Sequence, residues 1–470
     1  MAVRRPDAAT VGHRRALLLV VALVAVTACD DAERATPEPA TRQRSAVVVD
    51  TDGGSDDAIA LLYLLQHPDV DVIGITVSGT GIVHCNPGVA NVLGWVELVG
   101  EAQVPVSCGR SEPMAGGRSF PESWRTQADG RYDGVFPAGR GAPDPRPATT
   151  LLHDLVTDED RPVTVLALGP LTNLADALGT APELAEEISS VVAMGGAFDV
   201  PGNVDLPGAP AAASTEWNLY VDPVAAQTVL DAEVDLTFVP LDSAVGIDAF
   251  EVRALARRAT RPAGSAVAEL LLSSPFFTSP GFALWDPLAA AVVADADAFL
   301  TSGRPARVVV DGPEAGRTVG DDGRPVSVAR PARAADLVAE LLGVLSGRGS
   351  PLDIDRSPDL SVVVGDHTCT TSDRVLVAGP VVLDVGSRGA AAIGTMAPDR
   401  DLADVEALLA SGAPAVAPEW FPLVALLQGG GPVVARIEPG RLDVVCIDAG
   451  EDGALLVAGI AEVTVRTTGR

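Results

Sequence analysis

Mostly apolar runs and helix-spaced apolar positions alternate along residues 47–239. Five short, mostly apolar runs, which predict buried strands, lie at 47–49, 70–77, 163–168, 191–194 and 236–239. Between these runs, apolar residues recur at the spacing of one helix face in 58–66, 89–99, 171–178 and 221–230. Strands that alternate with helices form a mainly parallel sheet covered by helices on both faces. The first part of the chain therefore predicts an α/β fold.

A different pattern begins near residue 349. Short β-like runs divided by Gly, Pro and Asp lie at 362–364, 374–377, 381–385, 433–437, 442–447 and 454–463, with a helix expected at 402–410. A chain of 470 residues is also longer than one hydrophobic core usually serves. We therefore predict a smaller β-rich domain of unknown function at 348–470.

The start of the chain predicts export. Arg14 and Arg15 precede the apolar stretch 16–26, which is too short to span a bilayer and matches the apolar region of a signal peptide. The segment that ends at Cys29, Val-Thr-Ala-Cys, resembles a bacterial lipobox, which implies that Cys29 is lipidated and becomes the new N-terminus after cleavage. We expect a lipoprotein signal peptide at 1–29, a flexible tether at 30–45, and a protein anchored to the outer face of the bacterial cell membrane.

Charge narrows the range of partners. The formal net charge is −30, whereas a nucleic-acid surface needs clustered Lys and Arg. We therefore expect no nucleic-acid partner, and small neutral ligands or cations fit the composition better.

Four cysteines remain besides Cys29. In an exported protein, Cys85, Cys108, Cys369 and Cys446 allow three complete pairings, and the sequence does not choose among them. Pairing within each half would join Cys85 to Cys108 and Cys369 to Cys446. Free buried thiols are the alternative.

The richest chemistry lies at the end of the first apolar run. Asp50, Asp52, Asp56 and Asp57 fall within eight positions and would repel one another without a positive charge among them. Ca²⁺ and Mg²⁺ prefer oxygen ligands, and the glycines at 53–54 let the chain curl so that carboxylates converge. Because ligands bind beyond the carboxyl ends of strands in such sheets, we predict a metal site there.

Two other motifs begin in a similar way, of which the phosphatase motif is disfavoured and the EF-hand fails. A haloacid-dehalogenase-type phosphatase normally has Thr or Val where this chain has Gly54. An EF-hand loop needs a ligand at its fifth position and Glu at its twelfth, where this chain has Gly54 and Leu61. Neither a phosphatase nor an EF-hand explains the cluster.

The segment 50–57, Asp-Thr-Asp-Gly-Gly-Ser-Asp-Asp, resembles the signature Asp-x-Asp-Pro-Gly-x-Asp-Asp of the calcium-dependent (inosine-uridine preferring) nucleoside hydrolases. Four further motifs of that family follow in order at 167–174, 192–197, 202–203 with 216–223, and 285–289. The resemblance covers roughly residues 46–346. It implies a nucleoside hydrolase-like domain at 46–347.

The resemblance also implies a role for each matching residue. Ca²⁺ would be held by Asp52, Asp57, Asp286 and the backbone carbonyl of Leu168, and Asp52 would also activate the attacking water. Asp56 would hold ribose hydroxyls. The remaining substrate contacts would come from Met194, Asn203, Glu216, Asn218 and Trp285. Asp50 is expected to support the loop.

The chain departs from the family pattern at two positions. Thr80 stands where many relatives have an Asn that contacts the sugar. Trp285 stands where many have a His that protonates the departing base, and an indole cannot donate a comparable proton. The Trp285 ring would stack on the base or simply pack in the core. His84, near a strand end, is the alternative acid, and a structural role is its simpler reading.

These residues predict a function. The resemblance implies hydrolysis of the N-glycosidic bond of ribonucleosides or related N-ribosides to free base and ribose, as in purine or pyrimidine salvage. The retained aspartates favour an enzyme over the alternative, a non-catalytic calcium-dependent nucleoside- or sugar-binding lipoprotein. The resemblance also implies a homo-oligomer. The identity of the base stays open.

Overall fold

The structure is a computed structural model, and it describes residues 43–204, 215–279, 281–365, 368–386, 389–410, 417–428, 431–449 and 455–467. The predicted signal peptide, Cys29 and residues 30–42 of the tether lie outside the described residues. Within the described ranges, no helix is both long enough and apolar enough to cross a membrane.

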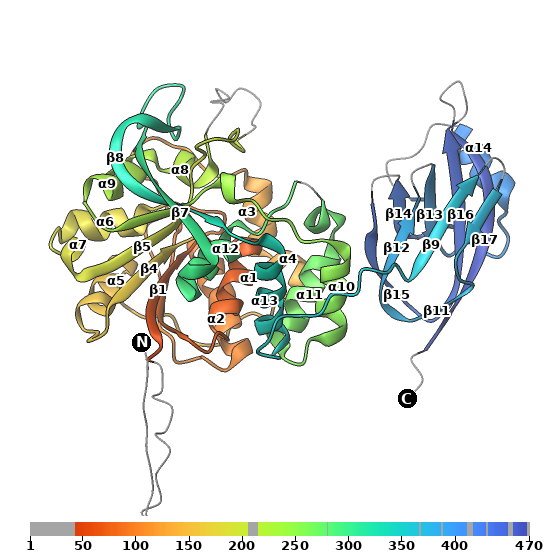
Figure 1. Ribbon diagram of the computed structural model, residues 1–470, viewed down its shortest axis with the longest axis horizontal. Coiled ribbons are helices and arrows are strands. Elements are labelled where there is room, and N and C mark those ends of the chain that lie inside the picture. Colours follow the sequence, from red (N-terminus) through yellow and green to blue (C-terminus); the bar gives the residue numbers. More distant parts are fainter. Residues whose placement is uncertain are drawn as a thin grey trace, which may run out of the picture. The chain divides into compact units, whose positions relative to one another are not determined.

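An eight-stranded sheet organises residues 45–331 (Figure 1). Its strands lie in the order β3-β2-β1-β4-β5-β6-β8-β7, and only the β7–β8 pair is antiparallel. The bounds are β1 Ser45–Thr51, β2 Val70–Val77, β3 Val106–Cys108, β4 Val163–Ala167, β5 Ile188–Met194, β6 Leu236–Val239, β7 Phe299–Val308 and β8 Thr318–Pro331. The predicted α/β fold with a mainly parallel sheet is confirmed.

Helices cover both faces of this sheet because alternate strand residues point to opposite sides. Val47 and Val49 of β1 lie in one apolar core, and Ala46 and Val48 lie in a second core. The first core is closed by α1 Ser55–Leu64, α2 Cys85–Val99, α10 Ala249–Arg258, α11 Pro262–Ser273, α12 Trp285–Ala294 and α13 Ala334–Ser346. The second is closed by α5 Ala148–Thr157, α6 Thr172–Thr180 and α9 Pro223–Asp231. Four shorter helices, α3 Glu122–Asp129, α4 Arg131–Gly134, α7 Leu184–Glu187 and α8 Trp217–Val221, lie in the connections.

The β7–β8 hairpin is the part of the sheet that the apolar pattern missed. Half of the residues of β7 are exposed to solvent, so its sequence carries Thr, Ser, Gly and Arg in place of an apolar run. The three-residue strand β3 is also too short to produce a periodic signal. Strands that do not bury a face leave little mark on the sequence.

The C-terminal region forms two further sheets, of order β10-β9-β12-β15 and β11-β17-β16-β13-β14. Their bounds are β9 Leu360–Gly365, β10 Thr368–Thr371, β11 Val375–Val377, β12 Gly379–Val385, β13 Ala390–Gly394, β14 Leu423–Gln428, β15 Val433–Ile437, β16 Gly440–Ala449 and β17 Leu455–Arg466. The expected helix is present as α14 Leu402–Ala410. Side chains from both sheets form a shared apolar core, which confirms the β-rich prediction.

The cysteines pair within each half of the chain. Cys85 is bonded to Cys108, which joins the start of α2 to the end of β3. Cys369 of β10 is bonded to Cys446 of β16, so the second disulfide links the two C-terminal sheets. The free-thiol alternative does not hold for these four residues.

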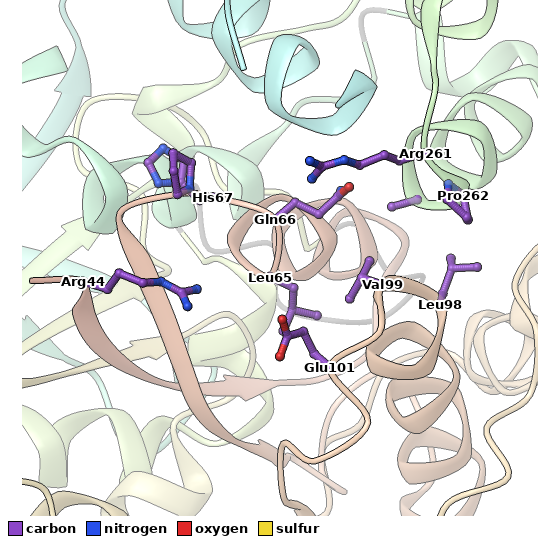
Figure 2. A pocket seen from close by; sticks show the side chains of 11 residues that line it. Arg44, Leu65, Gln66, His67, Leu98, Val99, Glu101, Arg261 and Pro262 are labelled. Carbon is purple, nitrogen blue, oxygen red and sulfur yellow. The ribbon is translucent and has the colours of Figure 1, made fainter. Parts of the chain in front are cut away.

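A hollow of about 410 Å³ opens at the amino-terminal end of the main sheet (Figure 2). Its lining residues come from just before β1, from the carboxyl ends of α1 and α2 with the residues that follow them, and from the start of α11, among them Arg44, His67, Glu101 and Arg261. Arg44 donates to the carbonyl of Val70 and pairs with Asp71, so it fastens β1 to β2. This hollow lies at the opposite end of β1 from the aspartates and forms no part of the site below.

Candidate functional site

The sheet topology creates a crevice beside β1. The chain passes to one side of β1 to form β2 and β3 and to the other side to form β4, β5 and β6. Ligands of such sheets bind beyond the carboxyl ends of the strands, where the strand order reverses. Asp50 pairs in register with Thr76 of β2 and Ala167 of β4. The residues that follow, including Asp52 and Leu168, are therefore brought side by side at this edge.

Residues 50–57 form what we call the acidic loop, which joins β1 to α1. Gly53 has a φ of +76°, a left-handed conformation that lets the loop turn back toward the helix. Asp57, in the first turn of α1, accepts hydrogen bonds from the backbone amides of Asp52 and Gly54, both at 3.0 Å. The Thr51 hydroxyl also donates to Asp57. Asp57 thus closes the loop on itself at the positive end of the helix dipole.

Asp286 joins the acidic loop from a distant part of the chain. It lies in the first turn of α12, which packs against α1. Oxygen atoms of Asp56, Asp57 and Asp286 all lie within 4.8 Å of one another. The Asp57 carboxylate also adjoins that of Asp52. Four carboxylates, drawn from two segments, therefore converge at one point.

These carboxylates are poorly solvated and lack cationic partners. Asp52, Asp57 and Asp286 are only 4%, 1% and 3% exposed. Across the described ranges, neither these three residues nor Asp56 forms an ion pair with Lys, Arg or His. One oxygen of Asp286, Oδ1, is buried without a hydrogen-bond partner there. Buried charges normally need a partner or a metal.

The pKa values of the clustered carboxylates also indicate that the group needs a cation. Burial, reinforced by the neighbouring carboxylates, raises the pKa of Asp52 and of Asp286 well above the usual range. Burial and the Asp57 charge raise the pKa of Asp56 to about 7. A divalent cation would relieve this repulsion, and an all-oxygen set of carboxylates and carbonyls is the donor chemistry that suits Ca²⁺. The residues present therefore fit the expected metal.

The grouping differs in one respect from the expected ligand set. Asp56, expected to hold ribose, lies within the compact group with Asp57 and Asp286, whereas Asp52, expected as a ligand, lies at its side. The reason is local, because one Asp52 oxygen, Oδ2, accepts a hydrogen bond from the amide of Ile82 at 3.3 Å. The individual roles of Asp52 and Asp56 stay predictions.

Glycines allow two loops to close over Asp52. A Cβ atom added at Gly81 would lie 2.2 Å from the Asp52 Cβ, and one at Gly169 would lie 2.5 Å from it. Real side chains never approach so closely, so both positions require glycine. In addition, the Val83 amide donates to the Asp52 carbonyl at 3.1 Å. Asp52 is held on several sides.

Asn218 links two other predicted site residues, Leu168 and Met194, at neighbouring strand ends. Its side-chain amide donates to the carbonyl of Leu168 at 2.9 Å and to the carbonyl of Met194 at 3.2 Å. The sulfur of Met194 also lies 3.2 Å from this amide nitrogen. The Leu168 carbonyl, expected to bind metal, is thus oriented by a side chain from α8, and Met194 is placed at the end of β5.

Glu216 and Asn203 bind backbone in this structure. Glu216 is the N-cap of α8. Its buried carboxylate accepts hydrogen bonds from the backbone amides of Gly196, Asn218 and Leu219. Burial raises the pKa of Glu216 to about 7. The Asn203 side-chain oxygen accepts from the amide of Trp217 at 3.1 Å. Both residues organise the backbone around Asn218, and their sugar contacts stay predictions.

Thr80 and Trp285, which depart from the family pattern, and the alternative acid His84 all make contacts within the protein. The Thr80 hydroxyl lies 2.9 Å from that of Ser78 and 3.0 Å from that of Thr172, so it is engaged within the protein. The His84 ring nitrogen, Nδ1, lies 2.8 Å from an Asp129 carboxylate oxygen. Trp285, half-buried at the start of α12, packs against the first core. Its indole N–H has no hydrogen-bond partner among the described residues.

Sequence reasoning missed two residues next to the site, Arg125 and Tyr132. The Tyr132 hydroxyl donates to the carbonyl of Gly53 in the acidic loop at 3.2 Å. Arg125 donates to the carbonyls of Gly79 and Val83, both at 3.1 Å. Each contact spans more than 40 residues of sequence, and no local pattern signals it.

The main α/β region resembles known proteins. A family model described as inosine-uridine preferring nucleoside hydrolase matches residues 47–340. Uridine nucleosidase 1 from Arabidopsis thaliana is 35% identical over 196 residues, which are 42% of this chain and 56% of that protein. The chain spans only 56–61% of the length of the first curated relatives that it matches.

Solved structures resemble the same region. An inosine-uridine preferring nucleoside hydrolase from Bacillus anthracis is 26% identical with a TM-score of 0.57, covering 65% of this chain and 99% of that one. A purine-preferring ribonucleoside hydrolase from Gardnerella vaginalis is 28% identical with a TM-score of 0.56, again covering 65% and 99%. The family model alone covers more than half of the 470 residues. The chain therefore belongs to the inosine-uridine preferring nucleoside hydrolase family.

Proposed function

We propose that this protein hydrolyses the N-glycosidic bond of ribonucleosides or related N-ribosides and releases a free base and ribose. The observation that carries the proposal is the group formed by the buried Asp52, Asp57 and Asp286 and the half-buried Asp56, for which the described residues supply no cationic partner. A group of buried acids is expensive to maintain. A bound cation that contacts a substrate at the same place would explain why these acidic side chains are grouped.

The proposed metal is Ca²⁺, held by Asp57, Asp286 and the Leu168 carbonyl, with Asp52 as a further ligand. When bound, the ion would hold a water and sugar hydroxyls close together. Asp52 would accept the proton of the water that attacks the anomeric carbon, and Asp56 would bind ribose hydroxyls. The remaining negative charge of the cluster would stabilise the positive charge that develops on the ribosyl ring.

The leaving base is the open part of the proposal. Relatives bear names that point to uridine and to purines, so family membership does not select one base. We propose that Trp285, next to Asp286, stacks on the base and favours its departure. His84 would have to separate from Asp129 before it could act as an acid.

The proposed activity is tested with a panel of substrates. The full exported chain would be incubated with inosine, guanosine, adenosine, uridine, cytidine or nicotinamide riboside, with Ca²⁺ or with a chelator, while free base is measured. We expect chelator-sensitive release of at least one base. Calcium-dependent nucleoside binding with no release would instead favour the alternative, a non-catalytic binding lipoprotein, which the departures at Thr80 and Trp285 keep under consideration.

We also propose that the protein is exported and anchored by a lipid on Cys29. The two disulfides, Cys85–Cys108 and Cys369–Cys446, support this location because such bonds persist in oxidising compartments. Cys29→Ser is expected to abolish labelling by a radioactive fatty acid and to leave the signal segment uncleaved. Unlabelled wild-type protein in the soluble fraction would contradict the anchor. A homo-oligomer is part of the same proposal and is checked by light scattering of the purified protein.

A further inference from the structure

Arg125 occupies an unusual position for a cation. It lies in α3, is only 6% exposed, and donates through one terminal nitrogen to the carbonyls of Gly79 and Val83. Throughout the described part of the chain, no carboxylate pairs with Arg125, and its Nε has no hydrogen-bond partner. Burying an unpaired guanidinium is unfavourable for stability. A role in function would explain why the fold retains it.

Arg125 donates hydrogen bonds to the same segment that binds Asp52. We call residues 79–83 the Asp52-binding loop. The Ile82 amide donates to the Asp52 carboxylate, and the Val83 amide donates to the Asp52 carbonyl. Arg125 therefore binds the carbonyls at the two ends of the loop, while amides of the same loop bind Asp52.

The opposite end of α3 is attached next to this loop. Asp129 accepts a hydrogen bond from the His84 amide at 2.9 Å and also contacts the His84 ring. Independent contacts keep the loop folded without Arg125, namely the Ser78–Thr80–Thr172 hydroxyl chain and the Cys85–Cys108 disulfide. Loss of Arg125 should consequently displace the loop without unfolding it.

A second residue from the same region reaches the acidic loop. Arg131, Tyr132 and Asp133 have φ angles of 58°, 53° and 58°, a left-handed run that is unfavourable for residues with a Cβ atom. Such strain persists where surrounding contacts enforce it, and it gathers at functional sites. Here it directs the buried Tyr132 side chain so that its hydroxyl donates to the carbonyl of Gly53.

We propose that Arg125 and Tyr132 are positioning residues that set the geometry of Asp52 and the acidic loop for metal binding and hydrolysis. Arg125 acts through the Asp52-binding loop, and Tyr132 acts through the carbonyl that follows Asp52. Residues of this kind, behind the direct ligands, typically change metal affinity or activity 10–100-fold when they are replaced. The kinetic part of this inference rests on the proposed function, whereas the metal-binding part does not.

The test compares Arg125→Met and Tyr132→Phe with a matched control, Arg324→Met. Arg324 likewise donates to two backbone carbonyls, those of Leu230 and Val234, but it does so at the carboxyl end of α9, away from the acidic loop. Calcium affinity of the full chain is measured by titration calorimetry. We expect a decrease of about tenfold for Arg125→Met and for Tyr132→Phe, and a change within about twofold for Arg324→Met.

Kinetics at saturating Ca²⁺ provide a second measurement. For Arg125→Met we expect kcat to fall about 10–100-fold with KM changed less than about threefold, because the displaced group acts on the reaction and not on ground-state binding. Arg125→Lys should recover part of the loss. Unfolding temperatures of all variants are recorded in parallel.

Two results would overturn the inference. One is wild-type calcium affinity in both Arg125→Met and Tyr132→Phe. The other is a loss of affinity that Arg324→Met reproduces at the same decrease in unfolding temperature, since that would indicate a general structural effect. If Arg125→Met does not fold, Tyr132→Phe decides, because it removes a single oxygen. If the wild-type protein releases no base, the proposed function fails, and calorimetry still decides the positioning roles.

Discussion

Asp52→Asn is expected to lower kcat by at least about 10³-fold at saturating Ca²⁺, because it removes the proposed proton acceptor together with one negative charge. The substitution preserves the shape of the side chain and leaves an oxygen that can accept the Ile82 amide, so the fold around Gly81 and Gly169 should persist. The measurement is steady-state release of base from the best substrate of the panel. A variant that keeps more than about a tenth of wild-type kcat would exclude Asp52 as the base.

Asp50→Asn is the matched control for this experiment. Asp50 is also buried in the acidic loop, but its carboxylate accepts hydrogen bonds from the Thr76 hydroxyl at 2.7 Å and the Asn173 amide at 2.8 Å. These contacts fasten β1 to β2 and α6, which agrees with the expected supporting role. We expect kcat of Asp50→Asn to stay within about tenfold of wild type, with a lower unfolding temperature.

Removal of Ca²⁺ is expected to lower the unfolding temperature by on the order of 10 °C at pH 7.5. A ligand present at 1,000 times its Kd stabilises a fold by about 4 kcal/mol, and each kcal/mol shifts the unfolding temperature of a domain of this type by about 2–4 °C. Without the ion, the buried Asp52, Asp57 and Asp286 and the half-buried Asp56 repel one another. Scanning calorimetry of chelated, desalted protein with and without added Ca²⁺ measures the shift.

The effect of metal removal should also depend on pH. Burial raises the pKa of Asp56 and Glu216 to about 7, so the folded metal-free protein binds protons that the unfolded chain has already released. The stability of metal-free protein should therefore decrease as pH rises from about 4 toward 7, and the stabilisation by Ca²⁺ should grow over the same range. Equal unfolding temperatures with and without Ca²⁺ at pH 7.5 would contradict a metal in this cluster.

Local sequence determined much of the fold and the core of the site. Strands that bury both faces, such as β2 and β6, can be predicted from their apolar runs. The predicted bounds of β2, Val70–Val77, are those in the structure. The acidic loop is a contiguous segment, so its four aspartates were evident together. Asp286 was found only through a family motif, because nothing near it in sequence indicates the acidic loop.

Tertiary structure alone decided how these residues meet. The grouping of Asp56 with Asp57 and Asp286 depends on the packing of α1 against α12. The contacts of Arg125 with the Asp52-binding loop and of Tyr132 with Gly53 join segments more than 40 residues apart. The sequence also did not predict the exposed strand β7 or the backbone contacts of Glu216. Sequence patterns record which side chains are buried and which lie close along the chain, whereas the position of a catalytic group is set by contacts between segments that only the folded chain brings together.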